Sequence, residues 1–554
     1  MKNIYMTNSV TQARRVRRTH GFLWLAFMAL LLSCGTLVAQ ESNDADRAET
    51  RPRATNRDEL VITFGTGDTE MDFRKAYLAS EAQLFTALYE GLFSYHPYTM
   101  SPIPAIAASW DVSSDKKQWT FHLREDAKYA NGDPVTAEDF RAAWLSLLRL
   151  GEQAPYSSLF DIIEGARNYR LRRQQDEQKV GVKAPDKHTL VVRLSSPASF
   201  FPSMLCHHSF NPIHPSMLGK KNWTKSVGVA NGPFTIQEQN ATRIVMVKNP
   251  YYWDAQQVTL NKLTIRFTKS GDEASTLWNS GEARWISGDV NLNALTDLSG
   301  ISLNPMFATS YYFIRSAKAP WNDYRVRRAL ILALPWDEIR DGYYLPAKTL
   351  IYPIPGYPEV EGLTMTDTEE SVKLLAEAGF PLGEGLPELV IKITPARDAS
   401  RVAKLMAETW GELGVPVRIS VIPYDQYFQA LKQDDYNVGS TSWIGDFADP
   451  YTFLQMWRRD SNLNDAKHND ADYEKLMEKS MSEEGEQRWQ TLSEAENLLL
   501  DRGSVLPISH SPALNIVDTD ELDGWYPNAL DIHPFKYLSF KALRALPGVA
   551  VLRR

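Results

Sequence analysis

Helix and strand patterns alternate in the later part of the chain. The pattern comprises helices at 369–378 and 400–413, each ended by a glycine, and strands at 389–393, 417–421 and up to 443. Strands and helices that alternate at this spacing form βαβ units around a largely parallel sheet. In such sheets, ligands bind beyond the carboxyl ends of the strands. The sequence therefore predicts an α/β fold with a ligand site directly after residue 443.

Two aspartates follow this predicted strand end, and their surroundings differ. Asp449 precedes Pro450, which suits the first position of a helix, so its carboxylate can cap the helix that follows. Asp446 has no such role and stands between Trp443 and Phe447. A carboxylate among aromatic rings is costly unless a cation or several N–H donors meet it. On residue type alone the cation belongs to the protein, and the alternative is a cationic ligand.

The first half of the chain also contains local signals of folded structure. Residues 119–124 alternate between apolar and polar side chains, which predicts a half-buried strand. Thr136 and Asp139 have the spacing of a capping box, and an apolar helical stripe begins at Phe140. Further strands are expected at 60–64, 190–194 and 244–247, and a short helix at 79–91.

Length and charge limit the class of protein. A chain of 554 residues is too long for one core, so two or three domains are expected. The formal net charge of −8 argues against nucleic acid as a partner, because neutralising phosphates requires clustered Lys and Arg. The 15 Trp, 24 Tyr and 22 Phe suit flat walls for ligand stacking as well as cores.

The N-terminus has the features of a targeting segment. A basic region with four arginines precedes an apolar run at 22–32 that is too short to span a bilayer comfortably. The run ends in LLSCG at 31–35, which resembles a bacterial lipobox and implies diacylation of Cys34. We therefore expect a lipoprotein signal peptide at 1–34 and a flexible tether at 35–57. The alternative is cleavage after Ala39, which would release a soluble protein.

Signals of metal binding or catalysis are weak. The adjacent His207 and His208 would point to opposite sides of a strand, and no third ligand has a suitable spacing. With Cys34 acylated, Cys206 is left without an intramolecular disulfide partner. The chain lacks G-x-S-x-G, H-E-x-x-H, G-x-x-x-x-G-K-[ST] and C-x-x-C. We expect no enzyme, although a hydrolase that uses two carboxylates would leave no local motif.

An ordered series of motifs resembles the family 5 extracellular solute-binding proteins of bacterial ABC importers, most closely the oligopeptide-binding proteins. The resemblance covers about residues 58–541, and no single motif is specific by itself. The motifs are LYEGL (88–92), PAIAASW (104–110), WTFHLR (119–124), NGDPVTAEDF (131–140), NGPF (231–234), KNPYYW (248–253), NDYRVRRAL (322–330) and WIGDFADPYTF (443–453).

The resemblance implies a periplasmic-binding-protein-like fold of type II, cluster C. This fold is a two-lobed clamp with an extra domain, built from mixed sheets flanked by helices. The expected domains are I (58–90, 215–308 and 513–554), II (91–214) and III (309–512), and domains I and III close on the ligand about a hinge. We expect an exported monomer without a cofactor, held in the cell envelope or periplasm by its lipid anchor.

The resemblance also implies a binding site for the N-terminus of a peptide. The family aspartate that matches Asp446 binds the α-ammonium of the peptide, and the backbone beside it, Ile444 and Gly445, pairs with the extended ligand as an added strand. Trp443 matches a tryptophan of the pocket wall. Packing of the surface between the lobes is the alternative role of Trp443, and likewise of Tyr424 and Asn464.

The other ligand contacts are less closely conserved in type. Tyr424 stands where many relatives have a stacking tryptophan, and Asn464 matches a pocket asparagine. Arg397 is the nearest equivalent of an arginine that fixes the carboxylate of dipeptides, although the loop is shorter here. A basic residue that one of the longer-peptide relatives carries six positions before the aspartate is replaced by Ser440. Peptide length therefore stays open.

Several functions remain compatible with the sequence. The leading hypothesis is a lipid-anchored receptor that hands short peptides to an ABC permease. The second is a binding protein for another solute, such as an oligosaccharide, nickel or haem. An exported hydrolase is the third, and a sensor or adhesin without a transporter is the fourth.

Overall fold

The computed structural model describes residues 52, 54–65, 69–220, 223 and 229–542. The described residues from 54 to 542 form one compact unit. The predicted signal peptide, Cys34 and most of the predicted tether lie outside the described residues. Within the described part of the chain, no helix is long and apolar enough to cross a membrane.

The main element of the fold is a mixed sheet of ten strands. Pairing is parallel within β14-β13-β15 and where β1 joins β10 and β11, and antiparallel elsewhere. The strands in spatial order are β14 (Val417–Val421), β13 (Leu389–Ile393), β15 (Val438–Ile444), β12 (Ile301–Ile314), β16 (Val505–Val517), β11 (Trp285–Ser287), β1 (Glu59–Gly65), β10 (Lys262–Thr268), β9 (Arg243–Lys248) and β8 (Phe234–Gln239).

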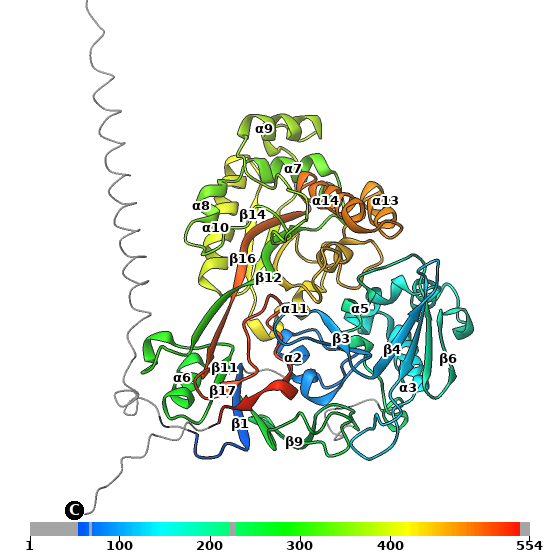
Figure 1. Cartoon of the computed structure of the whole chain (residues 1–554). Helices are drawn as coiled ribbons and strands as arrows, with labels where there is room; N and C mark the ends of the chain where they lie inside the picture. Colours follow the sequence, from blue (N-terminus) through cyan, green and yellow to red (C-terminus); the bar gives the residue numbers. More distant parts are fainter. Residues whose placement is uncertain (1–51, 53, 66–68, 221–222, 224–228, 543–554) are drawn as a thin grey trace, which may run out of the picture. The chain divides into compact units, whose positions relative to one another are not determined.

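Two long antiparallel strands, β12 and β16, form the middle of this sheet (Figure 1). They connect the half of the sheet that contains β11 with the half that contains β15. Their register shifts between Pro305 and Thr309, which is where the predicted boundary between domains I and III falls. The division into three domains stays a prediction.

Helices and strands alternate around β13–β15, as the sequence predicts. Strands β13 and β14 have the predicted bounds, and α9 (Thr368–Glu377) begins one residue earlier than expected. Helix α10 (Arg397–Glu412) begins three residues earlier than predicted, with Asp398 in its first turn, where a carboxylate complements the helix dipole. The other helices of this part are α7 (Tyr324–Leu332), α8 (Trp336–Arg340), α11 (Tyr424–Leu431), α12 (Tyr451–Leu454), α13 (Ala471–Ser480) and α14 (Gly485–Asp501).

A second, four-stranded antiparallel sheet lies between residues 107 and 193. The predicted strand at 119–124 is confirmed as β5, and the capping box of α3 is confirmed because the Thr136 N–H donates to Asp139 Oδ2 at 2.8 Å. The sheet consists of β4 (Ala107–Val112), β5 (Gln118–Leu123), β7 (Thr189–Arg193) and β6 (Val182–Asp186), with α3 (Ala137–Leu150) packed against it.

Shorter elements complete the described part. Two of them contribute to the site below, the 3-10 helices η4 (Pro155–Ile162) and η6 (His208–Phe210). The remaining helices are α2 (Ala79–Leu88), α4 (Ala166–Arg170), α5 (Phe201–Met204) and α6 (Gly271–Asn279), and two small sheets pair β2 (Phe93–Tyr95) with β3 (Pro102–Pro104) and β17 (Leu522–Asp523) with β18 (Ser539–Phe540). The result is an α/β fold of mixed sheets with flanking helices.

Candidate ligand-binding site

Asp446 lies two residues beyond the end of β15, and hydrogen bonds to its backbone N–H and carbonyl groups fix its position. Its N–H donates to Thr452 Oγ1 at 2.9 Å, and the Tyr95 hydroxyl donates to its carbonyl oxygen at 3.1 Å. The preceding Gly445 donates to the Phe307 carbonyl at 2.8 Å. A Cβ at Gly445 would lie 2.4 Å from Phe307 Cδ1, so only glycine fits this close approach. The glycine at 445 and these hydrogen bonds thus determine where the Asp446 carboxylate lies.

The carboxylate of Asp446 is buried without a basic side chain beside it. The residue is 9% exposed, Thr452 Oγ1 donates to Oδ2 at 3.0 Å, and the Tyr156 hydroxyl is a further hydrogen-bond partner. No lysine or arginine within the described residues forms an ion pair with it. Burial raises the pKa of Asp446 to about 7, against the lowering effect of these two hydrogen bonds.

Among the described residues, His207 is the one basic side chain that lies within ion-pair distance of this carboxylate. Its Nε2 lies 3.6 Å from Asp446 Oδ1, and its Nδ1 accepts the Ser209 N–H at 3.3 Å. The proton of the neutral ring therefore belongs on Nε2, toward Asp446. Burial and the neighbouring His208 hold the pKa of His207 well below its usual value. His207 is thus neutral and does not supply a positive charge.

The geometry of the histidine pair corrects the sequence interpretation. His207 and His208 lie at the start of η6, not on a strand, because the His207 side chain caps this turn. Their ring centroids are 4.0 Å apart. Within the described residues, no group of three or more His, Cys, Asp and Glu side chains could hold a metal ion.

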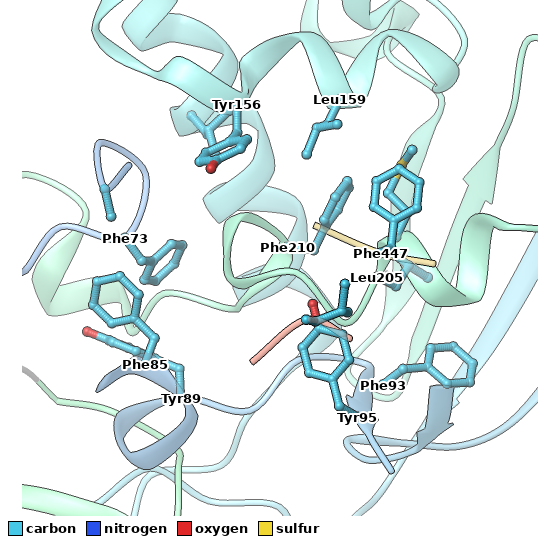
Figure 2. Packing of buried hydrophobic residues seen from close by; sticks show 14 of the residues in the cluster. Phe73, Phe85, Tyr89, Phe93, Tyr95, Tyr156, Leu159, Leu205, Phe210 and Phe447 are labelled. Atoms are coloured by element: carbon cyan, nitrogen blue, oxygen red, sulfur yellow. The ribbon is translucent and has the colours of Figure 1, made fainter. Parts of the chain in front are cut away.

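Aromatic side chains surround the Asp446 position. Tyr95, Tyr156 and Phe447 belong to one buried cluster although they come from three distant segments of the chain (Figure 2). Tyr156 lies 6.1 Å from Trp443 and 6.5 Å from Tyr77, measured between ring centroids. The low polarity of these walls is the physical cause of the raised pKa.

Trp443 lines a small pocket that opens to solvent, and several of its walls belong to the same cluster. Asn464 lines the same pocket, but its side-chain amide is already hydrogen-bonded to backbone groups of the protein. Its Nδ2 donates to the carbonyls of His468 and Arg458, and its Oδ1 accepts the His468 N–H. The pocket is lined by Tyr77, Tyr311, Phe313, Thr441, Trp443, Met456, Trp457, Leu463, Asn464, Asp465 and Ala466.

Tyr424, Arg397 and Ile444 are not among the residues that line this pocket. Tyr424 is the first residue of α11 and is 62% exposed, and Arg397 is the exposed first residue of α10. One turn after Tyr424, Phe428 contacts Tyr77, at 5.4 Å between ring centroids. Ile444 is the last residue of β15 and pairs with Ala308 of β12. The roles of all these residues in binding stay predictions.

One edge of β15 is open beside the carboxylate. β13 pairs with β15 only at Val438 and Gly439, whereas β12 pairs with β15 along its whole length. On the β13 side, the Ser440 N–H donates to the Tyr427 hydroxyl at 3.0 Å and the Ser440 carbonyl accepts from it at 2.8 Å, and residues 441–444 have no strand partner within the described chain. An unpaired strand edge is a surface on which an extended chain can add.

Asp449 differs from Asp446 in having a full set of internal partners. Its carboxylate accepts two hydrogen bonds from Arg488, at 2.7 and 2.9 Å, and a third from the Tyr451 N–H at 2.9 Å. The last of these confirms the predicted cap at the start of α12. Arg488 also lies over the Phe200 ring, 4.1 Å from its centroid.

Sequence reasoning missed most of the partners of Asp446. Tyr156 and His207 meet it across 290 and 239 positions of the chain, so no local pattern connects them. Thr452 lies in the same turn as Asp446 and could have been found. A hydroxyl six residues after an unexplained aspartate, at the start of a helix, is a candidate donor to it.

This fold, with a buried carboxylate beside an aromatic pocket and an open strand edge, defines a class of ligand-binding proteins. Residues 101–465 match the model of the bacterial extracellular solute-binding proteins, family 5 (middle region). The chain belongs to this family.

Known proteins resemble this chain both in sequence and in structure. The periplasmic oligopeptide-binding protein OppA of Salmonella typhimurium is 29% identical, over 86% of this chain and 92% of that protein. The probable deoxycholate-binding periplasmic protein YgiS of Escherichia coli is 26% identical, over 81% and 87%. The structure of the Escherichia coli murein tripeptide binding protein MppA matches with a TM-score of 0.77 and 25% identity, over 87% of this chain and 99% of that one. The fold is therefore the periplasmic-binding-protein-like fold of type II, cluster C, as predicted.

Proposed function

We propose that this protein is the substrate-binding protein of an ABC transporter and captures short peptides at Asp446. The observation that carries the proposal is the buried carboxylate of Asp446, which has neutral hydrogen-bond partners and no lysine or arginine partner within the described residues. A buried charge is costly unless a cation or several hydrogen-bond donors compensate it. The α-ammonium group of a peptide is such a cation.

The surroundings of the carboxylate suit a peptide N-terminus. The ammonium group has three N–H donors, and the carboxylate oxygens and the Tyr156 hydroxyl are acceptors on one small surface. The open edge of β15 can pair with the peptide backbone. Both contacts are independent of side-chain identity, so they give affinity for many peptides.

Closure of two lobes would bury this charge pair. Domains I and III, with the bounds given above, are connected by β12 and β16, and the register shift at 305–309 is a natural position for a hinge. A peptide that contacts both lobes stabilises the closed state. The permease would then recognise the closed, loaded protein.

The location of the protein is part of the proposal. The lipobox at Cys34 supports a lipid anchor in the cell envelope, because two or more acyl chains hold a protein stably at a membrane. The relative OppA is a periplasmic protein by name. We propose that this protein acts as an anchored monomer at the outer side of the permease.

A second candidate ligand is another solute, because YgiS is named for deoxycholate binding. The aromatic pocket would suit an apolar ring system or an oligosaccharide. A solute with a carboxylate, however, would bring a second negative charge toward Asp446. Such a ligand would bind better when Asp446 is neutralised, whereas a peptide would bind worse.

Calorimetry on protein that has been unfolded and refolded to remove carried-over ligand tests the proposal. The titrants are a mixed library of peptides of about two to six residues, its N-acetylated twin, deoxycholate, an oligosaccharide panel, nickel and haem. We expect heat from the free peptide library alone. Binding of deoxycholate or a sugar, with no response to either peptide library, would overturn the peptide assignment.

A further inference from the structure

A second carboxylate, Asp465, lines the pocket that Trp443 shares with Asn464. Asp465 is partly buried, with 19% of its side chain exposed, and its one ion-pair partner within the described residues is Lys432 at 2.7 Å. The Lys432 side chain is 51% exposed. An exposed lysine holds a carboxylate only weakly, since solvent screens the pair and the side chain is free to move away.

The pocket that contains Asp465 has aromatic walls. Tyr311, Trp443 and Trp457 are buried and line it, and the ring of Tyr77 closes it on the side of Tyr156. Aromatic faces accommodate the methylene stem of a lysine or arginine and attract its charged end. A pocket with aromatic walls and one carboxylate is therefore complementary to the charged end of a basic side chain.

Two residues that line this pocket carry buried hydrogen-bond donors without partners in the described part of the chain. The indole N–H groups of Trp443 and Trp457 have no hydrogen-bond acceptor within the described residues. Buried donors are nearly always paired. A bound peptide offers carbonyl oxygens that could accept from them, so these groups are a second indication that a polar ligand enters this pocket.

The pocket lies directly beside the Asp446 position. Tyr77 is 6.0 Å from Trp443 and 6.5 Å from Tyr156, between ring centroids, and the charges of Asp446 and Asp465 both act on its hydroxyl. A peptide whose ammonium group meets Asp446 would therefore place one of its first side chains in the pocket.

We infer that this pocket selects peptides that carry a lysine or arginine near the N-terminus, through the Asp465 carboxylate and the aromatic walls. The inference rests on the proposed peptide-binding function and adds a side-chain preference to it. Lys432 forms an ion pair with Asp465 when no such side chain is bound, and it is displaced when one enters the pocket.

Paired peptides that differ only in charge test this preference. Alanine tripeptides carry lysine or its uncharged counterpart norleucine at the first, second or third position, and calorimetry measures each affinity. We expect the lysine peptide to bind about tenfold more tightly at one of the first two positions, because a factor of ten corresponds to one partly buried charge contact. Equal affinities at every position would overturn the inference.

Two variants assign the preference to Asp465. Asp465→Asn should abolish the advantage of lysine over norleucine, and thermal unfolding checks that the variant is folded. Lys432→Met removes the competing cation and should increase the advantage about threefold. An advantage that persists in Asp465→Asn would contradict the role of Asp465. Failure of every peptide to bind would overturn the proposed function as well, whereas binding without preference overturns this inference alone.

Discussion

Asp446 and Asp449 are both buried and lie three residues apart, yet their charges have different partners. The carboxylate of Asp449 receives a bidentate pair from Arg488 and a backbone N–H. The carboxylate of Asp446 receives hydrogen bonds from Thr452 and Tyr156 and faces a neutral histidine. The first charge is used for the fold, and we propose that the second is left for a ligand. The difference shows that a binding site can be recognised by the partner that a buried charge lacks.

The largest expected effect is on stability, at Asp449. Replacing Asp449 by Ala leaves the Arg488 guanidinium buried without a counter-charge, which should lower the free energy of unfolding by about 3–5 kcal/mol. Urea unfolding followed by tryptophan fluorescence measures the change. Asp446→Asn is the matched control and should be no less stable than the wild type. Similar losses in both variants would remove the distinction between the two aspartates.

The next effect is on binding, at Asp446. Asp446→Asn keeps the shape of the side chain but removes the charge that attracts the ammonium group, so the affinity for a free peptide should fall about hundredfold. Titration calorimetry measures it, and thermal unfolding checks that the variant is folded. An affinity within about threefold of the wild-type value would show that the ammonium group lies elsewhere.

A substitution at Gly445 should lower both the stability and the peptide affinity of the protein. Gly445→Ala places a Cβ at 2.4 Å from Phe307 Cδ1, and relieving the overlap should cost about 1–3 kcal/mol of stability. The displaced backbone also carries Asp446 out of position, so peptide affinity should fall. Chemical unfolding and calorimetry on the same sample measure the two losses. A stable variant with unchanged affinity would show that the turn is not rigid.

The smallest expected effect is a pH dependence of binding. The pKa of Asp446 is about 7 in the folded protein, and an ammonium ligand needs the ionised form. Affinity should therefore fall below pH 7, by about tenfold per pH unit, with release of a proton on binding. Calorimetry in buffers of different ionisation enthalpy counts this proton. Asp446→Asn should show neither effect, and an equal dependence in the variant would assign the proton to another group.

The same raised pKa predicts a change in stability without ligand. An unfolded aspartate has a pKa of about 3.9, so between about pH 4 and 7 the folded state holds a proton that the unfolded state has lost. Stability contributed at Asp446 is thus present below pH 4 and is lost as the pH rises through 7. Glu496 has a pKa raised to about 7 by burial and acts in the same direction. The difference between wild type and Asp446→Asn isolates the Asp446 contribution.

Local rules predicted the elements that position the site. The apolar runs at 389–393 and 417–421 and the capping box of Thr136 are confirmed because each depends on neighbours within a few residues. The position of Asp446 after a strand end was predicted from the βαβ pattern in the same way. The start of α10 was placed three residues late, because the exposed first turn carries no apolar periodicity.

Contacts between distant segments could not be predicted from one sequence. Arg488 meets Asp449 across 39 positions, and His207 meets Asp446 across 239. The family resemblance suggested Asn464 as a pocket residue, but only the structure shows that its amide is bonded to the backbone of Arg458 and His468. The sequence shows which buried charged residues need a partner, and only the folded structure shows which of them have one.

The central claim is that Asp446 keeps its charge for the ammonium group of a peptide. A double cycle tests it most directly, with calorimetry of trialanine and N-acetyl-trialanine against the wild type and Asp446→Asn. Acetylation and the substitution should each reduce affinity about hundredfold, and together they should cost little more than either alone, because both remove the same charge pair. Two independent losses that add in full would show that the ammonium group and Asp446 do not meet.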